Sequence, residues 1–282
     1  MEAISFKDLD GKVCAITGGG GVIGKSLAAG LASVGVKVAI LDLYKDAATE
    51  AAKYVQSETG TAALGVEANV LDKKSLESAK KVINDKLGEI DILINCAGGN
   101  SPRATTQVEF MDHDNKDGEG TFLGLDIEGF RSVFDLNFLG TLLPSMVLTG
   151  DMVKNEKGVI LNVSSMNAFR PLTKIPAYSA AKSSINNFTE WLAVHFAKIN
   201  IRVNAIAPGF FLTNQNRFLL LDKETNELTA RGHKIINGTP MGKFGEPDDL
   251  HGTVLYLLSD ISGFVTGVGI PVDGGFNAYS GV

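Results

Sequence analysis

Short apolar runs alternate along the chain with longer stretches whose apolar residues recur at helical spacing. The runs lack a strict alternation of polar and apolar positions, which indicates parallel strands buried on both faces. We expect strands at residues 12–17, 36–42, 62–66, 90–95, 158–163, 201–207 and 268–272. We expect helices at residues 22–34, 45–57, 72–87 and 246–259, and one from residue 176 towards residue 198.

The order of these elements predicts the fold. Strands that alternate with helices form a parallel sheet with helices on both faces. We therefore predict an α/β protein with a single-domain, doubly wound (Rossmann) parallel sheet of about seven strands over residues 1–282. We find no internal repeat and no second domain, and the length suits one α/β domain.

Two segments interrupt the alternation. Residues 99–125 carry several aspartates and glycines with little periodicity, and residues 208–240 separate the sixth strand from the last helix. Loops of this length in a compact domain are usually functional. We expect a substrate-loop insertion at 99–125 and a lid at 208–240, with a tolerated surface insertion as the alternative for the first.

The bulk composition narrows the class of protein. Hydrophobic residues make up 44% and charged residues 21%, as in ordinary soluble proteins. The net charge of −6 disfavours a nucleic-acid partner, which would need an excess of Lys and Arg on one face. Cys14 and Cys96 form no metal-binding motif, and no apolar run approaches the ~18 residues of a membrane span. Since no signal-peptide core precedes the first strand, we expect a cytoplasmic protein without metal or membrane partner.

A glycine-rich loop, TGGGGVIGKS at residues 17–26, follows the first predicted strand. Gly19, Gly21 and Gly24 match GxGxxG, the dinucleotide fingerprint, but residues 19–26 also match GxxxxGK[ST], the P-loop of nucleotide hydrolases. Both motifs bring the backbone close to a phosphate at a helix N-terminus. The loop by itself therefore leaves the two interpretations open.

Asp42 ends the second predicted strand. A dinucleotide site places an acidic side chain there, where it accepts hydrogen bonds from the ribose hydroxyls. The same carboxylate would repel a 2′-phosphate. We therefore predict NAD(H) as the cofactor in preference to NADP(H).

A candidate acid/base pair opens the helix that starts at residue 176. Tyr178 and Lys182 lie four residues apart and so share one helix face. A neighbouring ammonium should lower the phenol pKa from ~10 and make Tyr178 a proton donor and acceptor. Ser165 ends the fifth strand, at the sheet edge where ligand sites form, and could bond the same substrate oxygen. Taken singly, a YxxxK pair also arises by chance, and such a serine is usually a cap.

Together these motifs resemble the short-chain dehydrogenase/reductase family over nearly the whole chain. The strings NCAG, LNFLG, PG and PVDGG, which begin at residues 95, 136, 208 and 271, are similar to its motifs in order. The resemblance implies catalytic roles for Ser165, Tyr178, Lys182 and Asn137 and excludes the P-loop. It implies a cofactor site built from Thr17, Gly18, Gly19, Gly21, Val22, Ile23, Gly24, Asp42, Asn69, Val70, Asn95, Ala97, Gly98, Tyr178, Lys182, Pro208, Gly209, Phe211 and Thr213.

The resemblance also implies how the chemistry is divided. Tyr178 would exchange a proton with the substrate oxygen, and Ser165 would orient that oxygen. Lys182 would lower the pKa of Tyr178 and hold the nicotinamide ribose, and Asn137 would hold a water of the proton relay. Homo-oligomers, usually tetramers, are the expectation for this family.

Two positions depart from the family pattern. Val22 stands where the family has a loop glycine, so the glycine spacing is shifted by one residue. Asn69 and Val70 stand where many members have Asp-Val, and an asparagine can hydrogen-bond the adenine edge without a charge.

A narrower resemblance concerns the substrate. The strings SSMNAFRPLTKIPAYSAAK and APGFFLTNQNRFLL look like the D-mannonate oxidoreductase (D-fructuronate reductase) branch, which implies a small sugar-acid substrate. An arginine fork suits a carboxylate. The candidate substrate-binding residues are Arg170 or Arg217 for the carboxylate, Asn167 or Gln215 for hydroxyls, and Arg103 in the insertion. Another polyol, gluconate or keto-sugar dehydrogenase of the family is one alternative, and a non-catalytic NAD-binding protein is a second.

Overall fold

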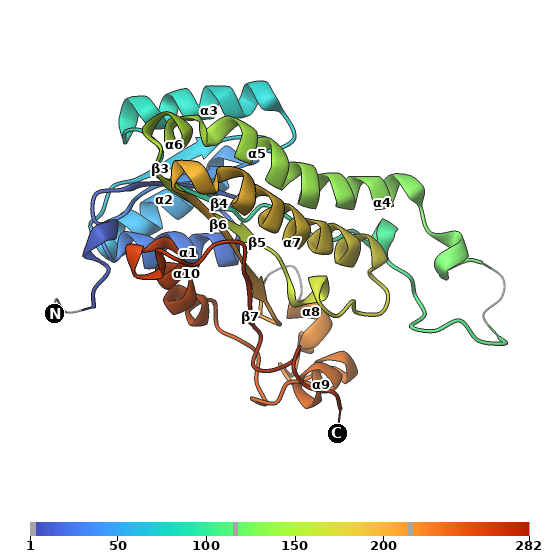
Figure 1. The fold of residues 1–282 in the computed structure, drawn as a ribbon. Coiled ribbons are helices and arrows are strands. Elements are labelled where there is room, and N and C mark those ends of the chain that lie inside the picture. The colour runs from blue at the N-terminus through green and yellow to red at the C-terminus, as the bar shows by residue number, and fades with distance from the viewer. Residues whose placement is uncertain (1–3, 115–117, 214–216, 282) are drawn as a thin grey trace.

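The computed structural model describes residues 4–114, 118–213 and 217–281. Seven parallel strands form one sheet in the order β3-β2-β1-β4-β5-β6-β7, which confirms the predicted doubly wound fold (Figure 1). The strands are β1 Val13–Thr17, β2 Lys37–Asp42, β3 Ala63–Glu67, β4 Ile92–Asn95, β5 Gly158–Val163, β6 Ile201–Pro208 and β7 Gly269–Val272. Strands β1, β4 and β5 are buried along their whole length, as expected for strands covered on both faces.

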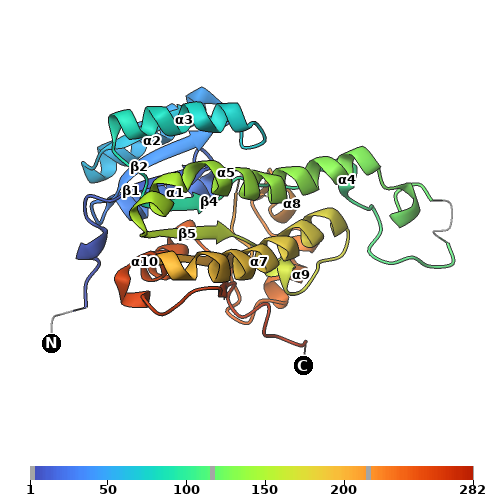
Figure 2. The same ribbon diagram turned by 45° about the horizontal axis from the view of Figure 1, so that its top comes forward.

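Helices cover both faces of the sheet (Figures 1 and 2). One core cluster joins the sheet to α1 Val22–Ala32, α2 Lys45–Thr59 and α10 His251–Leu258. The other joins it to α3 Lys73–Lys86, α5 Gly140–Leu148, α6 Gly150–Asn155 and α7 Pro176–Phe196. The two clusters give a three-layer α/β/α arrangement.

Local signals set several of the predicted boundaries. Asp72 caps α3, because its side chain accepts hydrogen bonds from the backbone N–H groups of Lys74 and Ser75. Gly88 follows the helix with a φ of +116°, a conformation that favours glycine. The helix expected at 246–259 is divided into a 3₁₀ helix, Pro247–Leu250, and α10. Pro247 at the first position and a capping box at Glu246 explain that start.

One long helical region had no predicted bounds. Helix α4 (Ile127–Phe134) continues through a π-helical turn, Asp135–Leu139, into α5 and then α6. Pro144 lies inside α5, and the π turn adds a residue to the helical repeat. These interruptions explain why the spacing of apolar residues did not define the helix.

The two irregular segments lie at the carboxyl end of the sheet. Residues 99–125 leave β4, form 3₁₀ helices at Pro102–Ala104 and Phe122–Gly124, and extend beyond α4 and α7 (Figure 1). Residues 208–240 leave β6 and include α8 (Arg217–Leu220) and α9 (Ala230–Asn237). Polar contacts tie the outer part of the insertion to its surroundings. Lys234 Nζ of α9 lies 2.5 Å from Glu109 Oε2, and the Thr106 N–H donates to the Lys174 carbonyl over 2.9 Å.

The strand order reverses between β1 and β4, and ligands of such sheets bind in the crevice at this reversal. Thr17 joins the two strand ends, because its hydroxyl oxygen accepts from the backbone N–H groups of Cys96 (3.1 Å) and Ala97 (3.2 Å). The glycine loop and the NCAG segment therefore lie side by side at the crevice.

Candidate active site

Close backbone packing explains the glycines of the loop. Gly18 has a φ of +62°, and a Cβ there would lie 2.7 Å from Ala97 Cα. A Cβ at Gly24 would lie 2.7 Å from Gly19 Cα. Gly21 is the N-cap residue of α1, and Val22 begins that helix in ordinary helical conformation. The shifted glycine spacing therefore leaves the loop tight and the helix N-terminus directed at the crevice, which is the arrangement that binds a phosphate.

Asp42 lies beside the glycine loop. Its Oδ2 accepts a hydrogen bond from the Gly20 N–H at 3.1 Å, and its Oδ1 accepts from the Tyr44 N–H at 3.2 Å. The carboxylate is therefore held in place at the end of β2, with lone pairs left for the hydroxyls of a ribose.

The residues that a P-loop would use point elsewhere. The Ser26 hydroxyl lies 2.8 Å from both Asp248 Oδ1 and His251 Nε2, between α1 and α10. Lys25 Nζ lies 4.8 Å from the centroid of the Tyr54 ring on α2. Neither side chain is placed to hold a phosphate or its metal ion, so the structure supports the dinucleotide interpretation.

Tyr178, Lys182 and Ser165 come together as predicted. Lys182 Nζ lies 5.6 Å from the centroid of the Tyr178 ring and donates to the carbonyl oxygen of Val163 over 2.8 Å. Ser165, which follows β5, lies near enough to the Tyr178 hydroxyl to lower its pKa. Ser165 and Lys182 are buried, so the cluster forms a low-dielectric pocket in which each polar contact counts more than in water.

The electrostatics differ from the prediction. Burial raises the pKa of Tyr178, the hydrogen bond from Ser165 lowers it, and the Cys96 thiol raises it further. Burial lowers the pKa of Lys182 to about 8. The prediction that the ammonium lowers the pKa of Tyr178 is therefore wrong for this structure, because Lys182 directs its charge to the Val163 carbonyl and desolvation of the phenol dominates.

Asn137 is fully buried in the π-helical turn. Its Nδ2 donates to the carbonyl oxygens of Gly99 and Val133, both at 2.7 Å, and its Oδ1 accepts from the Gly99 N–H at 3.2 Å. Both N–H donors are therefore used within the protein, and a water at this residue would have to bind a carbonyl oxygen. A Cβ at Gly98 would lie 2.6 Å from Asn137 Oδ1 and 3.2 Å from Lys182 Nζ, so Gly98 permits this close packing.

Some of the predicted cofactor residues are buried at the strand ends beneath the crevice. Thr17 and Asn95 are buried, and Asn95 Nδ2 donates to Ser145 Oγ and Asn162 Oδ1, both at 2.9 Å. The prediction missed this buried polar network. Its sequence signal is the placing of asparagines inside otherwise apolar strands.

Other predicted cofactor residues line the rim. Val70 is buried beside Gly140 of α5, while Asn69 is exposed and its Oδ1 accepts from the Leu71 N–H. At the far side, Pro208 ends β6, the Gly209 N–H donates to the Val272 carbonyl, and Phe211 is buried. Ile23 and Thr213 are half-buried in α1 and after β6.

The substrate candidates differ in what they already contact. Arg103 binds the Asp126 carboxylate (Nη2–Oδ2 2.5 Å), and Arg217 Nη2 donates to Asn226 Oδ1 over 3.0 Å. Arg170 is exposed, and its guanidinium has no ion pair or hydrogen bond among the described residues. Asn167 is buried and contacts Ser165. Gln215 lies outside the described residues.

One residue of the insertion packs near the acid/base pair. Ala104 is fully buried in a small apolar cluster with Val133 and Ala177, and the Tyr178 ring and Phe130 pack against it. The insertion therefore contacts, through Ala104, the apolar cluster against which Tyr178 packs.

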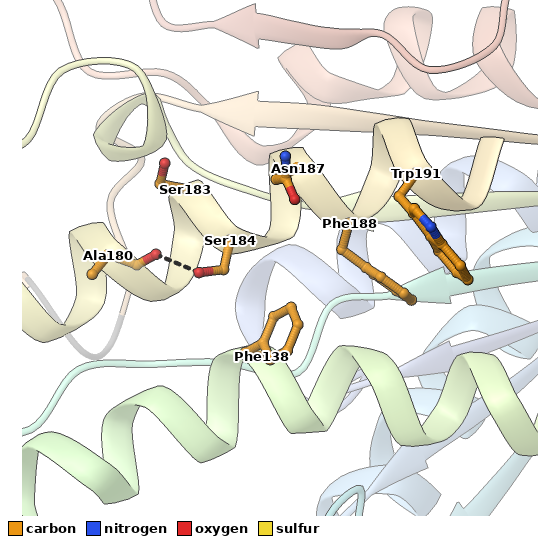
Figure 3. Close-up of a pocket in the computed structure, with 7 residues that line it drawn as sticks. All are labelled: Phe138, Ala180, Ser183, Ser184, Asn187, Phe188 and Trp191. Carbon is orange, nitrogen blue, oxygen red and sulfur yellow. Dashed lines mark hydrogen bonds between the residues drawn. The ribbon is translucent and has the colours of Figure 1, made fainter. Parts of the chain in front are cut away.

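A hollow of about 570 Å³ lies on another face of α7 and contains none of the predicted site residues. Figure 3 shows Phe188 and Trp191 of α7 lining it opposite Phe138. Tyr178 and Lys182 lie on a different face of α7 from this hollow. Trp191 is 57% exposed and stacks between Phe188 and His195.

Fold and site together define a class. A doubly wound sheet with a tight glycine loop, an acidic residue at the end of β2 and a Ser-Tyr-Lys cluster is typical of dinucleotide-dependent dehydrogenases. Within the part of the chain that the structure describes, no cluster of three His, Cys, Asp or Glu side chains could hold a metal, and no helix is long and apolar enough to cross a membrane.

Comparison with known proteins identifies the family. The model of the short chain dehydrogenase family matches residues 12–224, and the chain is an oxidoreductase of that family. The "Uncharacterized oxidoreductase UxuB" of Bacillus subtilis (strain 168) is 51% identical over 98% of both chains. A crystal structure from Haemophilus influenza, of a protein proposed to be a D-mannonate oxidoreductase, has bound NAD; it is 49% identical over 98% of both chains, with a TM-score of 0.91. The 2-dehydro-3-deoxy-D-gluconate 5-dehydrogenase of Formosa agariphila is 30% identical over 99% of this chain and 97% of its own.

Proposed function

We propose that this protein is an NAD(H)-dependent reductase of keto sugar acids that converts D-fructuronate to D-mannonate and catalyses the reverse oxidation. The observation that carries the proposal is the cluster of Ser165, Tyr178 and Lys182, in which Ser165 and Lys182 are buried and Tyr178 is half-buried. Lys182 Nζ packs close to Gly98, in the NCAG segment that lies against Gly18 of the glycine loop. A non-catalytic NAD-binding protein would need no such cluster.

The crevice fits a dinucleotide. The backbone N–H groups at the start of α1 would hold the pyrophosphate. Gly18 packs directly on Ala97, so no side chain at residue 18 separates the glycine loop from the NCAG segment. Asp42 would accept from the ribose hydroxyls, which favours NAD(H) over NADP(H). When bound, the nicotinamide supplies or accepts the hydride.

The protein's own residues manage the substrate oxygen. As the carbonyl carbon of the ketone gains a hydride, its oxygen gains negative charge and takes a proton from the Tyr178 hydroxyl. A raised pKa keeps this phenol protonated near neutrality, as a proton donor must be. The Ser165 hydroxyl donates to the same oxygen, and Lys182 keeps a positive charge within the pocket. Alcohol oxidation is the exact reverse, with the phenolate taking the proton.

Arg170 supports a carboxylate on the substrate. It follows the Ser165 segment, is exposed and offers a guanidinium fork that no described residue pairs, which suits a carboxylate. The similarity to the Haemophilus protein and to a gluconate-type dehydrogenase supports a sugar acid of this kind.

The direct test is to assay the purified protein with D-fructuronate and NADH, following loss of NADH absorbance. We expect rapid turnover, and about 1,000-fold less in Tyr178→Phe with NADH binding intact. A panel of 2-dehydro-3-deoxy-D-gluconate, xylitol and glucose, each assayed with NAD⁺ by the gain of NADH absorbance, separates the alternatives within the family. Full activity in Tyr178→Phe, or no activity with any keto acid, would contradict the proposal.

A further inference from the structure

Two N–H groups donate to the oxygen of Ser165. The backbone N–H and the side-chain Nδ2 of Asn167 both lie 3.2 Å from Ser165 Oγ. A hydroxyl has two acceptor lone pairs and one donor hydrogen. Since both lone pairs are occupied, the Ser165 hydroxyl can act towards other groups only as a donor.

The amide of Asn167 cannot turn around. Its Oδ1 accepts a hydrogen bond from the Leu172 N–H at 3.1 Å, and only the amide oxygen can accept there. Nδ2 must then face Ser165. Asn167 is 8% exposed, so water does not compete strongly for either end of the amide.

The neighbouring serine, Ser164, hydrogen-bonds an asparagine in the opposite direction. The Ser164 hydroxyl donates to Asn186 Oδ1 over 2.6 Å, so there the serine gives its hydrogen away to an asparagine. Ser165 instead accepts hydrogen bonds, and its nearness lowers the pKa of Tyr178, as a hydroxyl that donates towards the phenol oxygen would.

We propose that Asn167 is a positioning residue that fixes the Ser165 hydroxyl as a one-way hydrogen-bond donor towards the reacting oxygen. The inference rests on the proposed ketone reduction and replaces the earlier prediction that Asn167 binds a substrate hydroxyl. One N–H of its amide donates to Ser165 and its Oδ1 accepts from Leu172, so the proposed effect of Asn167 on the substrate passes through Ser165. The charge that develops on the oxygen during hydride transfer then meets a donor that needs no reorientation.

Two substitutions at this position separate donation from packing. Asn167→Asp keeps the size of the side chain and the acceptor for Leu172, but it presents an oxygen to Ser165 and draws the hydroxyl hydrogen away from the substrate. Asn167→Ala removes both contacts and lets the hydroxyl rotate. We expect kcat to fall about 100-fold in Asn167→Asp and about 10-fold in Asn167→Ala, with little change in NADH affinity.

A double-mutant cycle tests whether Asn167 acts through Ser165. In a Ser165→Ala background, neither substitution of Asn167 should lower kcat further. Asn186→Ala, which removes the asparagine partner of Ser164, is the matched control and should retain activity within a few-fold. An Asn167→Asp variant more active than Asn167→Ala, or effects that appear only in KM and add to Ser165→Ala, would overturn the inference.

A second readout does not depend on turnover. Ultraviolet titration of the protein against its Tyr178→Phe variant reports the pKa of Tyr178, which the hydrogen bond from Ser165 lowers. Asn167→Ala should raise that pKa, and an unchanged value would sink the inference. If the unsubstituted protein reduces no ketone, the proposed function fails, and this titration still decides the role of Asn167.

Discussion

Arg170 is the residue on which substrate choice depends in the proposed function. Among the candidate arginines, Arg103 is paired with Asp126 and Arg217 donates to Asn226, while Arg170 has no partner among the described residues. A charge that is already paired offers less to a substrate carboxylate than one that is free.

We therefore expect Arg170→Ala to raise KM for D-fructuronate by about 30-fold or more, because a bidentate charge-assisted contact is lost. The same substitution should leave KM for a neutral keto sugar nearly unchanged. Arg103→Ala is the matched control and should alter neither constant strongly. Steady-state kinetics with both substrates measure this, and an equal effect of the two substitutions would exclude Arg170 as the carboxylate site.

Burying the charged Lys182 ammonium in the active site lowers the stability of the folded protein. Its pKa is about 8 in the folded protein and near 10.4 in an unfolded chain, so the folded state binds fewer protons between these values. The stability of the unsubstituted protein relative to Lys182→Met should therefore rise with pH through that window and be lowest below about pH 8.

Urea unfolding of both proteins at about pH 7 and about pH 10 checks this linkage. We expect the difference in unfolding free energy to shift by about 2 kcal/mol in favour of the unsubstituted protein at the higher pH. Lys198→Met removes an exposed lysine beyond the same helix and should retain activity, whereas Lys182→Met should lose it. A difference that is independent of pH would contradict the lowered pKa.

At the scale of elements, the β1–loop–α1 unit is the best-defined part of the crevice. Gly18 combines a positive φ with a backbone neighbour, Ala97, whereas Gly60 has a similar φ of +71° and open space around its Cα. Substitutions at Gly18 and Gly60 therefore separate the effect of backbone strain, which both share, from the effect of close packing, which only Gly18 has.

Gly18→Ala should destabilise the protein by about 1–3 kcal/mol and weaken NADH binding by more than about 10-fold, since β1 and β4 must separate to admit the methyl group. Gly60→Ala should cost about 1 kcal/mol and leave NADH affinity unchanged. Thermal unfolding and fluorescence titration with NADH measure the two effects. Equal NADH affinity in both variants would show that the approach of Gly18 to Ala97 is unimportant for the cofactor.

The elements show which features a sequence can specify. Apolar runs and caps such as Asp72 predicted the strands and α3 within one or two residues, because they act locally. The motifs likewise predicted that Ser165, Tyr178 and Lys182 lie close together. The direction in which Lys182 donates and the desolvation of Tyr178 depend on neighbours far along the chain. These long-range effects, and the π turn at Asn137, have no local pattern.

At the scale of the whole molecule, α7 exposes an apolar surface away from the site. Trp191 (57% exposed), which lines the hollow in Figure 3, and Val194 (79% exposed), three residues further along α7, lie on it. Exposed apolar surface of this kind is typical of interfaces between subunits. The predicted homotetramer stays a prediction, and α7 is a candidate contact for it.

Size-exclusion chromatography with light scattering tests the assembly. We expect a tetramer for the unsubstituted protein and smaller species for Trp191→Glu, because a buried charge would oppose association. Tyr54→Glu, on α2 at the other face of the sheet, is the control and should keep the native mass. A monomeric unsubstituted protein would refute the predicted tetramer.

The insertion and the segment after β6 meet through Lys234 and Glu109, whose side chains are 67% and 32% exposed. A water-screened ion pair of this kind contributes at most about 1 kcal/mol, and loops part and rejoin in about a microsecond or less. Typical turnovers take roughly a tenth of a second. The insertion and the segment after β6 would thus part and rejoin many thousands of times in each catalytic cycle, so a substrate should enter and leave without waiting for a gate.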